Sequence, residues 1–212
     1  MRNEERTMSI CYIFASGEYG TQWPDIQPGD LCIAADGGFS QMQAHGVDPD
    51  LVVGDFDSLG YVPPHPHIVR HPAEKDDTDT ALALSEGWSR GYRNFHIYGS
   101  LGGRLDHTLA NVQLLCGLVE QGGRGKLVGP GMTVTAVHNG TLELEGETGR
   151  TLSIFCLGEP AHGVTLEGLK YPLHGATMTV QVPLGVSNEF LGGPARITVE
   201  RGTLVVMIEN QV

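Results

Sequence analysis

The sequence predicts two domains of different class: an α/β domain with a doubly wound, mostly parallel sheet, followed by an all-β domain that is sandwich-like or barrel-like. Its first part alternates short apolar runs with helical patterns, which is typical of parallel strands covered by helices. Its second part consists of short runs that often alternate apolar and polar residues, separated by Gly, Pro and Asn. We place the two domains at residues 1–127 and 128–212.

Four buried parallel strands are predicted in the first domain, because four apolar runs each end in Gly, Asp or Ser. These runs lie in SICYIFASG, DLCIAADGG, PDLVVGDFDS and FHIYGSLGG. Helices are expected at residues 39–45, 78–90 and 106–121. The last helix has one apolar stripe. The stripe consists of Leu105, Leu109, Val112, Cys116 and Val119.

The second domain is predicted from a series of short strand-like segments after the glycine-rich break QGGRGK. They read MTVTAVH, TLELEG, RTLSIFCLG, GATMTVQVP, ARITVERG and TLVVMIE. No helical stripe of useful length occurs among them, so an antiparallel sandwich or barrel-like arrangement is expected.

Composition excludes several classes of function. The net charge is −12 and the pI is near 5.0, and no stripe of Lys and Arg is present, which argues against a nucleic-acid partner. No apolar stretch is long enough to span a membrane, and the start lacks the apolar segment of a secretory signal. The four cysteines are scattered without a CxxC pair, which favours buried reduced thiols. We therefore expect a cytoplasmic protein without a membrane partner.

Aspartate clusters carry the strongest chemical signal. All 11 aspartates lie between residues 25 and 106. Two motifs, GDFDS and KDDTD, supply Asp55, Asp57, Asp76, Asp77 and Asp79. Two ionised carboxylates about 4 Å apart repel by roughly 4 kcal/mol at an effective dielectric of 20, so converging carboxylates call for a cation. Mg²⁺ takes oxygen ligands together with substrate phosphates, which indicates nucleotide chemistry.

The KDDTD motif also begins a predicted helix, so Thr78 or Asp77 has an alternative role as its cap. Asp76 and Asp79 are three residues apart and are expected to share a face near the helix start. We therefore assign Asp76 and Asp79 to the site and expect Asp77 to face solvent.

Two glycine-rich motifs follow predicted strands. ADGG, at residues 35–38, suits either a phosphate contact or a tight turn, and by itself it favours the turn. GSLGGRLDH, at residues 99–107, combines glycines with an arginine where a helix begins, which suits phosphate binding. The alternative for the second motif is that Asp106 caps the helix and pairs with Arg104, and the motif alone does not decide between them.

Taken in order, the motifs ADGG, GDFDS, KDDTD, GSLGGRLDH, GLKYPL and GVSNEF resemble those of the thiamine pyrophosphokinase family, over nearly the whole chain. The resemblance implies transfer of the pyrophosphoryl group of ATP to the hydroxyl of thiamine, giving thiamine diphosphate and AMP, with Mg²⁺. It also implies a homodimer with the thiamine site at the subunit interface. Residues 1–127 would then bind nucleotide and metal, and residues 128–212 would bind thiamine and form the dimer.

The same resemblance implies a role for each motif residue. The expected Mg²⁺ ligands are Asp55, Asp57, Asp76 and Asp79. The expected catalytic residues are Asp79, Arg104 and Asp106. The expected ATP contacts are Asp36, Gly37, Gly38, Lys75, Thr78, Gly102, Gly103 and Arg104. The expected thiamine contacts are Asp106, Tyr171, Ser187 and Asn188. For the Ser-Asn pair a turn is the alternative.

Two other functions fit part of the sequence. LVVGDFDS is similar to the DxD loop of haloacid dehalogenase-like phosphohydrolases, in which Asp55 would be a covalent nucleophile. That family normally carries its nucleophile near the chain start, and its remaining motifs are not evident here. A non-catalytic nucleotide-sensing module would use the glycines and the arginine but would have no use for the acidic cluster.

Overall fold

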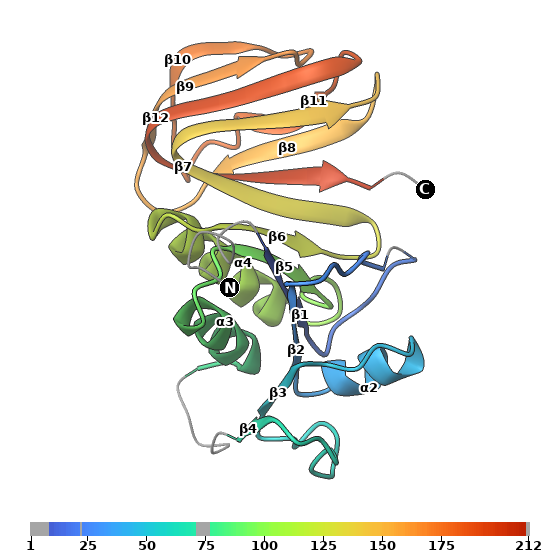
Figure 1. The fold of residues 1–212 in the computed structure, drawn as a ribbon. Coiled ribbons are helices and arrows are strands. Elements are labelled where there is room, and N and C mark those ends of the chain that lie inside the picture. The colour runs from blue at the N-terminus through green and yellow to red at the C-terminus, as the bar shows by residue number, and fades with distance from the viewer. Residues whose placement is uncertain (1–8, 22, 71–76, 211–212) are drawn as a thin grey trace. The chain divides into compact units, whose positions relative to one another are not determined.

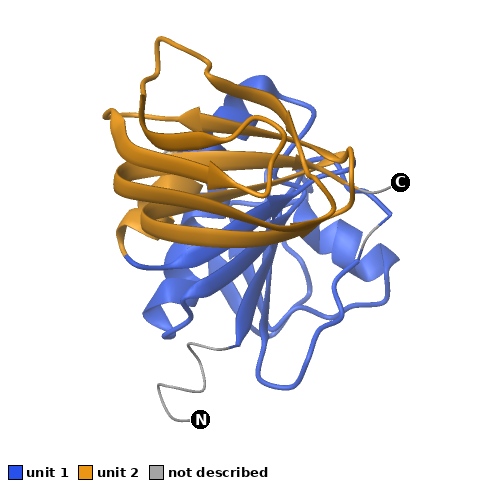
Figure 2. Ribbon diagram, turned by 90° about the horizontal axis from the view of Figure 1, so that it is seen from above, with its two compact units in different colours: residues 1–114, 122–130 blue, residues 115–121, 131–212 orange. Residues whose placement is uncertain are grey.

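The computed structural model describes residues 9–21, 23–70 and 77–210, which form two compact units. Unit 1 comprises residues 1–114 and 122–130, and unit 2 comprises residues 115–121 and 131–212 (Figure 2). Each unit has a hydrophobic core of its own. The described strands form one large mixed sheet, with parallel strands in unit 1 and antiparallel strands in unit 2.

Unit 1 contains a parallel sheet with the strand order β6-β5-β1-β2-β3-β4. Its strands are β1 (Ile10–Phe14), β2 (Leu31–Ala35), β3 (Leu51–Gly54), β4 (Ile68–Arg70), β5 (Asn94–Tyr98) and β6 (Arg124–Val128). The four predicted strands are β1, β2, β3 and β5. The sequence did not predict β4, which is only three residues long, or β6, which begins with the charged sequence RGK.

The helices of the structure match the predicted ones closely. They are α2 (Gly38–Ala44), α3 (Asp79–Ser89) and α4 (Leu105–Glu120). In Figure 1, α2 lies on the opposite side of the strands from α3, so the sheet has a helix on each face. None of the described helices has the length and apolar character that crossing a bilayer requires.

The predicted apolar stripe of α4 was partly wrong. Leu105 is 72% exposed and Leu109 is 58% exposed, whereas the buried face of the helix runs through Val112, Leu115 and Leu118. Apolar residues at spacings of three and four fit more than one face of this leucine-rich helix. Which face is buried depends on what the helix packs against, and periodicity does not contain that information.

Unit 2 is built from antiparallel strands. They are β7 (Met132–Gly146), β8 (Thr151–Cys156), β9 (Ala161–Glu167), β10 (Leu173–Met178), β11 (Gly185–Glu189) and β12 (Gly193–Glu209). The long strand β12 pairs with β7 along both halves, with β9 through its first half and with β8 through its second. Its register shifts between Val199 and Thr203, where the strand passes from β9 to β8. Side chains from β8, β9 and β12, including Ile154, Val164 and Ile197, pack into one core.

We predict that Gly38→Ala destabilises the protein by at least about 2 kcal/mol, because the added Cβ would overlap with the backbone carbonyl of Phe14 in β1. Denaturant unfolding measures the effect. Gly117→Ala is the matched control, since a Cβ at Gly117 inside α4 meets no atom within 4 Å beyond its own helix backbone and chain neighbours. The control is expected to leave stability unchanged or to raise it by up to about 1 kcal/mol. Wild-type stability in Gly38→Ala would contradict this packing.

Candidate active site

A pocket of about 680 Å³ is formed by the loops that follow β1, β2, β3 and β5, together with the first turns of α3 and α4. All the residues that line it belong to unit 1. In open parallel sheets, ligands bind beyond the carboxyl ends of the strands, because successive loops converge there. The pocket therefore lies where the topology of unit 1 predicts a ligand site.

Three carboxylates meet in this pocket. Asp36, Asp55 and Asp57 each offer an oxygen atom, and these atoms lie within 4.8 Å of one another. Asp36 is only 3% exposed, and its Oδ1 atom is buried without a hydrogen-bond partner in the described part of the chain. Leaving a buried polar atom unsatisfied costs about 1–3 kcal/mol, and more when the group is charged. A hard divalent cation such as Mg²⁺ would supply the missing partner, so the donor set fits this ion.

Local backbone geometry holds these carboxylates together. Asp36 has a positive φ of 47°, and its N–H donates to the carbonyl oxygen of Val53 at 2.8 Å, which joins the end of β2 to β3. Phe56 has a φ of 68° and is buried between the two aspartates of GDFDS. The N–H of Asp57 donates to Asp55 Oδ1 at 3.1 Å. The loop therefore forms a tight turn that brings both carboxylates to one pocket.

The structure partly changes the predicted metal set. Asp79 lines the pocket, but the cluster of close oxygen atoms among the described residues contains Asp36 in its place. Asp36 was predicted to contact ATP. Asp76 lies outside the described residues. The metal roles of Asp76 and Asp79 stay predictions.

Asp77 was predicted to face solvent, and it is exposed, but it also lines the pocket, which the sequence did not predict. Helix α3 begins at Asp79, and Thr78 has an extended backbone with ψ of 156°. Helical spacing therefore does not apply to Asp77. Thr78 also lines the pocket, and its hydroxyl accepts a hydrogen bond from the N–H of Ala81 at 3.2 Å, so it caps α3.

The glycine-rich loop before α4 reaches the pocket. Gly102, Gly103 and Arg104 line it, and the two glycines have φ angles of 82° and 59°. The N–H of Gly103 donates to Glu18 Oε1 at 3.0 Å. This backbone amide therefore already binds an anionic oxygen. Sequence reasoning missed Glu18, because it lies 85 residues from the loop that it contacts.

Arg104 pairs with Asp106, which was the alternative interpretation of this motif. Arg104 Nη2 donates to Asp106 Oδ2 at 2.6 Å, and Nε donates to Oδ1 at 3.2 Å. Both side chains are exposed. The hydrogen bond from Arg104 lowers the pKa of Asp106 and raises the pKa of Arg104. Asp106 is not among the residues that line the pocket, so its predicted roles with thiamine and in catalysis stay predictions.

The remaining predicted ATP contacts are Gly37, Gly38 and Lys75. Gly37 and Gly38 are not among the pocket-lining residues, and both pack closely against the end of β1 and the residues just after it. This is the tight-turn interpretation of ADGG. Lys75 lies outside the described residues. Among the pocket residues that the sequence did not indicate is Asn111, whose Nδ2 donates to the carbonyl oxygen of Ser100 at 2.8 Å.

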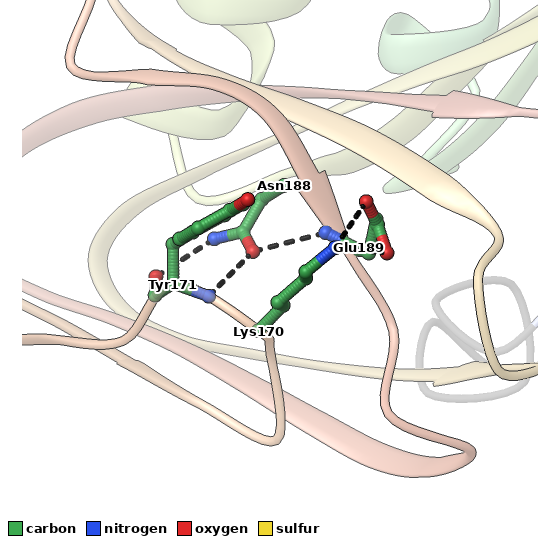
Figure 3. Close-up of polar contacts among 4 residues, drawn as sticks. All are labelled: Lys170, Tyr171, Asn188 and Glu189. Atoms are coloured by element: carbon green, nitrogen blue, oxygen red, sulfur yellow. Dashed lines mark hydrogen bonds and ion pairs between the residues drawn. The ribbon is translucent and has the colours of Figure 1, made fainter.

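In unit 2, Asn188 joins two segments of backbone (Figure 3). Its Oδ1 accepts hydrogen bonds from the N–H of Tyr171 at 3.0 Å and of Glu189 at 2.9 Å. Its Nδ2 donates to the carbonyl oxygen of Tyr171 at 2.9 Å. The side chain is buried, and both acceptor sites of its oxygen are used. Asn188 therefore fastens residues 170–171 to β11, and its amide oxygen has no acceptor site left for a ligand.

The two other predicted thiamine contacts in unit 2 are accessible. Ser187 is exposed and has a positive φ of 55°. Tyr171 is 57% exposed, and the ammonium group of Lys170 lies 5.6 Å from its ring centroid. Lys170 is itself paired with Glu189 at 2.9 Å, beside Asn188 (Figure 3). The thiamine roles of Ser187 and Tyr171 stay predictions.

Comparison with known proteins gives a consistent result. Two family models match the chain: "Thiamin pyrophosphokinase, catalytic domain" over residues 26–125 and "Thiamin pyrophosphokinase, vitamin B1 binding domain" over residues 140–204. A thiamine pyrophosphokinase of Bacillus subtilis (strain 168) is 31% identical over 186 residues, which cover 84% of this chain and 86% of the relative.

Solved structures agree with these matches. The crystal structure of thiamine pyrophosphokinase from Bacillus subtilis has a TM-score of 0.84 and 27% identity, and the match covers 96% of this chain and 100% of that chain. The crystal structure of thiamin pyrophosphokinase from Geobacillus thermodenitrificans has a TM-score of 0.79 and 26% identity, with coverage of 95% and 98%.

We predict that Asp36→Asn weakens Mg²⁺ binding at least tenfold, because it removes one of three converging charges. Without Mg²⁺, the variant is expected to be more stable than the wild type, since the same change relieves carboxylate repulsion. Calorimetric Mg²⁺ titration and thermal unfolding measure the two effects. Asp48→Asn, at an exposed aspartate that does not line the pocket, is the control. Unchanged Mg²⁺ affinity in Asp36→Asn would refute the site.

We predict that Asn188→Ala lowers the free energy of unfolding by about 1–3 kcal/mol, because two partly buried backbone N–H groups lose their acceptor. Faster hydrogen exchange at the Tyr171 amide is the local readout. Ser187→Ala changes the neighbouring exposed residue and is expected to shift stability by less than about 0.5 kcal/mol. Wild-type exchange at Tyr171 in Asn188→Ala would show that the amide does not fasten this segment.

Proposed function

Since the chain belongs to the thiamin pyrophosphokinase family, we propose that the unit 1 pocket transfers the pyrophosphoryl group of ATP to the hydroxyl of thiamine. The products are thiamine diphosphate and AMP, and the protein is an ATP-dependent diphosphotransferase. The observation that carries the proposal is the meeting of three carboxylates, a glycine-rich loop and Arg104 around one pocket. Each of these features suits a metal-bound polyphosphate.

The carboxylates Asp36, Asp55 and Asp57 would hold Mg²⁺, as their close oxygen atoms and the unsatisfied Asp36 Oδ1 suggest. When bound, Mg²⁺ would neutralise charge on the phosphate oxygens. We keep Asp79 as a further candidate ligand or catalytic residue, because it lines the same pocket. Asp76 remains a candidate on sequence grounds.

The chain's own groups would bind and position the substrates. The amides of Gly102 and Gly103 would donate to phosphate oxygens, as the amide of Gly103 now donates to a carboxylate. Arg104 would exchange its bidentate contact with Asp106 for one with phosphate. Asp79 or the released Asp106 would accept a hydrogen bond from the thiamine hydroxyl. Such positioning and electrostatic stabilisation supply most of the acceleration in phosphoryl transfer.

We assign thiamine binding to unit 2, where the vitamin B1 binding model matches residues 140–204. Ser187 offers an exposed hydroxyl, and Tyr171 offers an exposed ring for stacking. Asn188 would act by holding the segment that carries Tyr171. Residues 1–127 would then serve catalysis and residues 128–212 thiamine binding, as the sequence resemblance implies.

We further propose a homodimer with the thiamine site at the subunit interface. Exposed apolar side chains are concentrated in one stretch of unit 2, and such a concentration is typical of an interaction surface. They are Tyr171, Val180, Val182, Leu184, Val186 and Leu191. A second copy of the chain would cover them. A cytoplasmic location would suit the free cysteines, because thiols stay reduced there.

We predict that the purified protein, given ATP, Mg²⁺ and thiamine, forms AMP and thiamine diphosphate in equal amounts. Asp57→Asn is expected to lower turnover at least about a hundredfold without unfolding the protein, which is the scale for losing one preorganised charge contact. Chromatographic product analysis measures both, and Asp48→Asn again serves as the control. ADP or free phosphate as the main product would reject the proposal and favour the phosphohydrolase alternative with Asp55 as nucleophile.

A further inference from the structure

Glu18 contacts the glycine-rich loop inside the pocket. Its Oε1 accepts the hydrogen bond from the Gly103 N–H at 3.0 Å, and a Cβ built on Gly102 would lie 2.7 Å from its Oε2. The carboxylate therefore lies against both glycines. Glu18 also lies outside residues 26–125, which the catalytic-domain model matches.

The Glu18 carboxylate occupies the place that a bound anion would take at the Gly103 amide. Gly102 and Gly103 both have left-handed backbone conformations, and α4 begins two residues after Gly103. Backbone N–H groups in such turns at a helix start attract anions. Glu18 supplies an anionic oxygen from the chain itself. A phosphate group that uses the Gly103 amide has to displace it.

The displaced carboxylate would still be part of an acidic pocket. The pocket-lining acids are Glu18, Asp36, Asp55, Asp57, Asp77 and Asp79. A cation shared by Asp36, Asp55 and Asp57 would neutralise the cluster that these three form, but Glu18 is not part of that cluster. Its charge therefore opposes an entering polyphosphate, and it opposes most strongly a polyphosphate without a bound metal ion, which carries more negative charge.

We propose that Glu18 is a specificity-determining residue that competes with the substrate's phosphate for the Gly103 amide and thereby favours metal-complexed over metal-free polyphosphate. The inference rests on the proposed function for the identity of the ligand. The competition itself follows from the hydrogen bond and from the charges of the pocket.

Glu18→Gln tests the proposal, because it removes the charge while keeping the size of the side chain. The probes are ATP and inorganic tripolyphosphate, titrated calorimetrically either with excess Mg²⁺ or with EDTA. We expect the metal-free probes to bind about tenfold more tightly to Glu18→Gln than to the wild type, and the Mg²⁺ complexes to gain about threefold or less. Glu18→Ala, which also removes the hydrogen-bond acceptor, is expected to gain at least as much.

Glu145→Gln is the matched control, since Glu145 is exposed in β7 and does not line the pocket. It is expected to bind all probes as the wild type does. Unchanged or weaker binding of metal-free tripolyphosphate in both Glu18 variants would overturn the inference, as would the absence of polyphosphate binding in every version of the protein.

The inference and the proposed function fail in different ways. Tighter polyphosphate binding in the Glu18 variants without formation of AMP and thiamine diphosphate by the wild type would refute the function alone. Formation of both products with the same metal discrimination in the wild type and the variants would refute the role of Glu18 alone.

Discussion

The pocket of unit 1 is organised around the convergence of Asp36, Asp55 and Asp57 at the carboxyl edge of the sheet. Ionised oxygens this close repel by roughly 4 kcal/mol per pair at 4 Å and an effective dielectric of 20. The backbone holds them in place through the Asp36–Val53 hydrogen bond and the buried ring of Phe56. A ligand that binds this arrangement and not the unfolded chain stabilises the fold, by an amount that grows with its concentration relative to its Kd.

Several polar groups that could bind a ligand form hydrogen bonds with other groups of the protein. The Gly103 amide binds Glu18, Arg104 binds Asp106, and the Asn188 amide binds backbone. The first two contacts are exposed, and a phosphate group offers the same kind of acceptor, so exchange costs little. The side chain of Asn188 is buried, and breaking its contacts leaves backbone groups without their hydrogen-bond partner. Burial therefore separates groups that a substrate can recruit from groups that hold the fold.

Much of the architecture followed from local patterns. Apolar runs predicted β1, β2, β3 and β5, and the capping pattern predicted the start of α3 within one residue. The patterns failed where packing decides the outcome. Strands β4 and β6 carry a weak apolar signal, because a short or partly charged segment joins a sheet only when a neighbouring strand is already there. The buried face of α4 was predicted only in part for the same reason, since Val112 and Val119 are buried but Leu105 and Leu109 are exposed.

The sequence by itself determined the family, the class of reaction and the motifs around the pocket, because these depend on which residue types occur in which order. The tertiary structure alone decided that Asp36 joins Asp55 and Asp57, that Asp77 lines the pocket and that Glu18 reaches Gly103. The physical reason is distance. Which oxygen atoms come within a few ångströms depends on how loops from different strands meet, and that meeting is a property of the folded sheet.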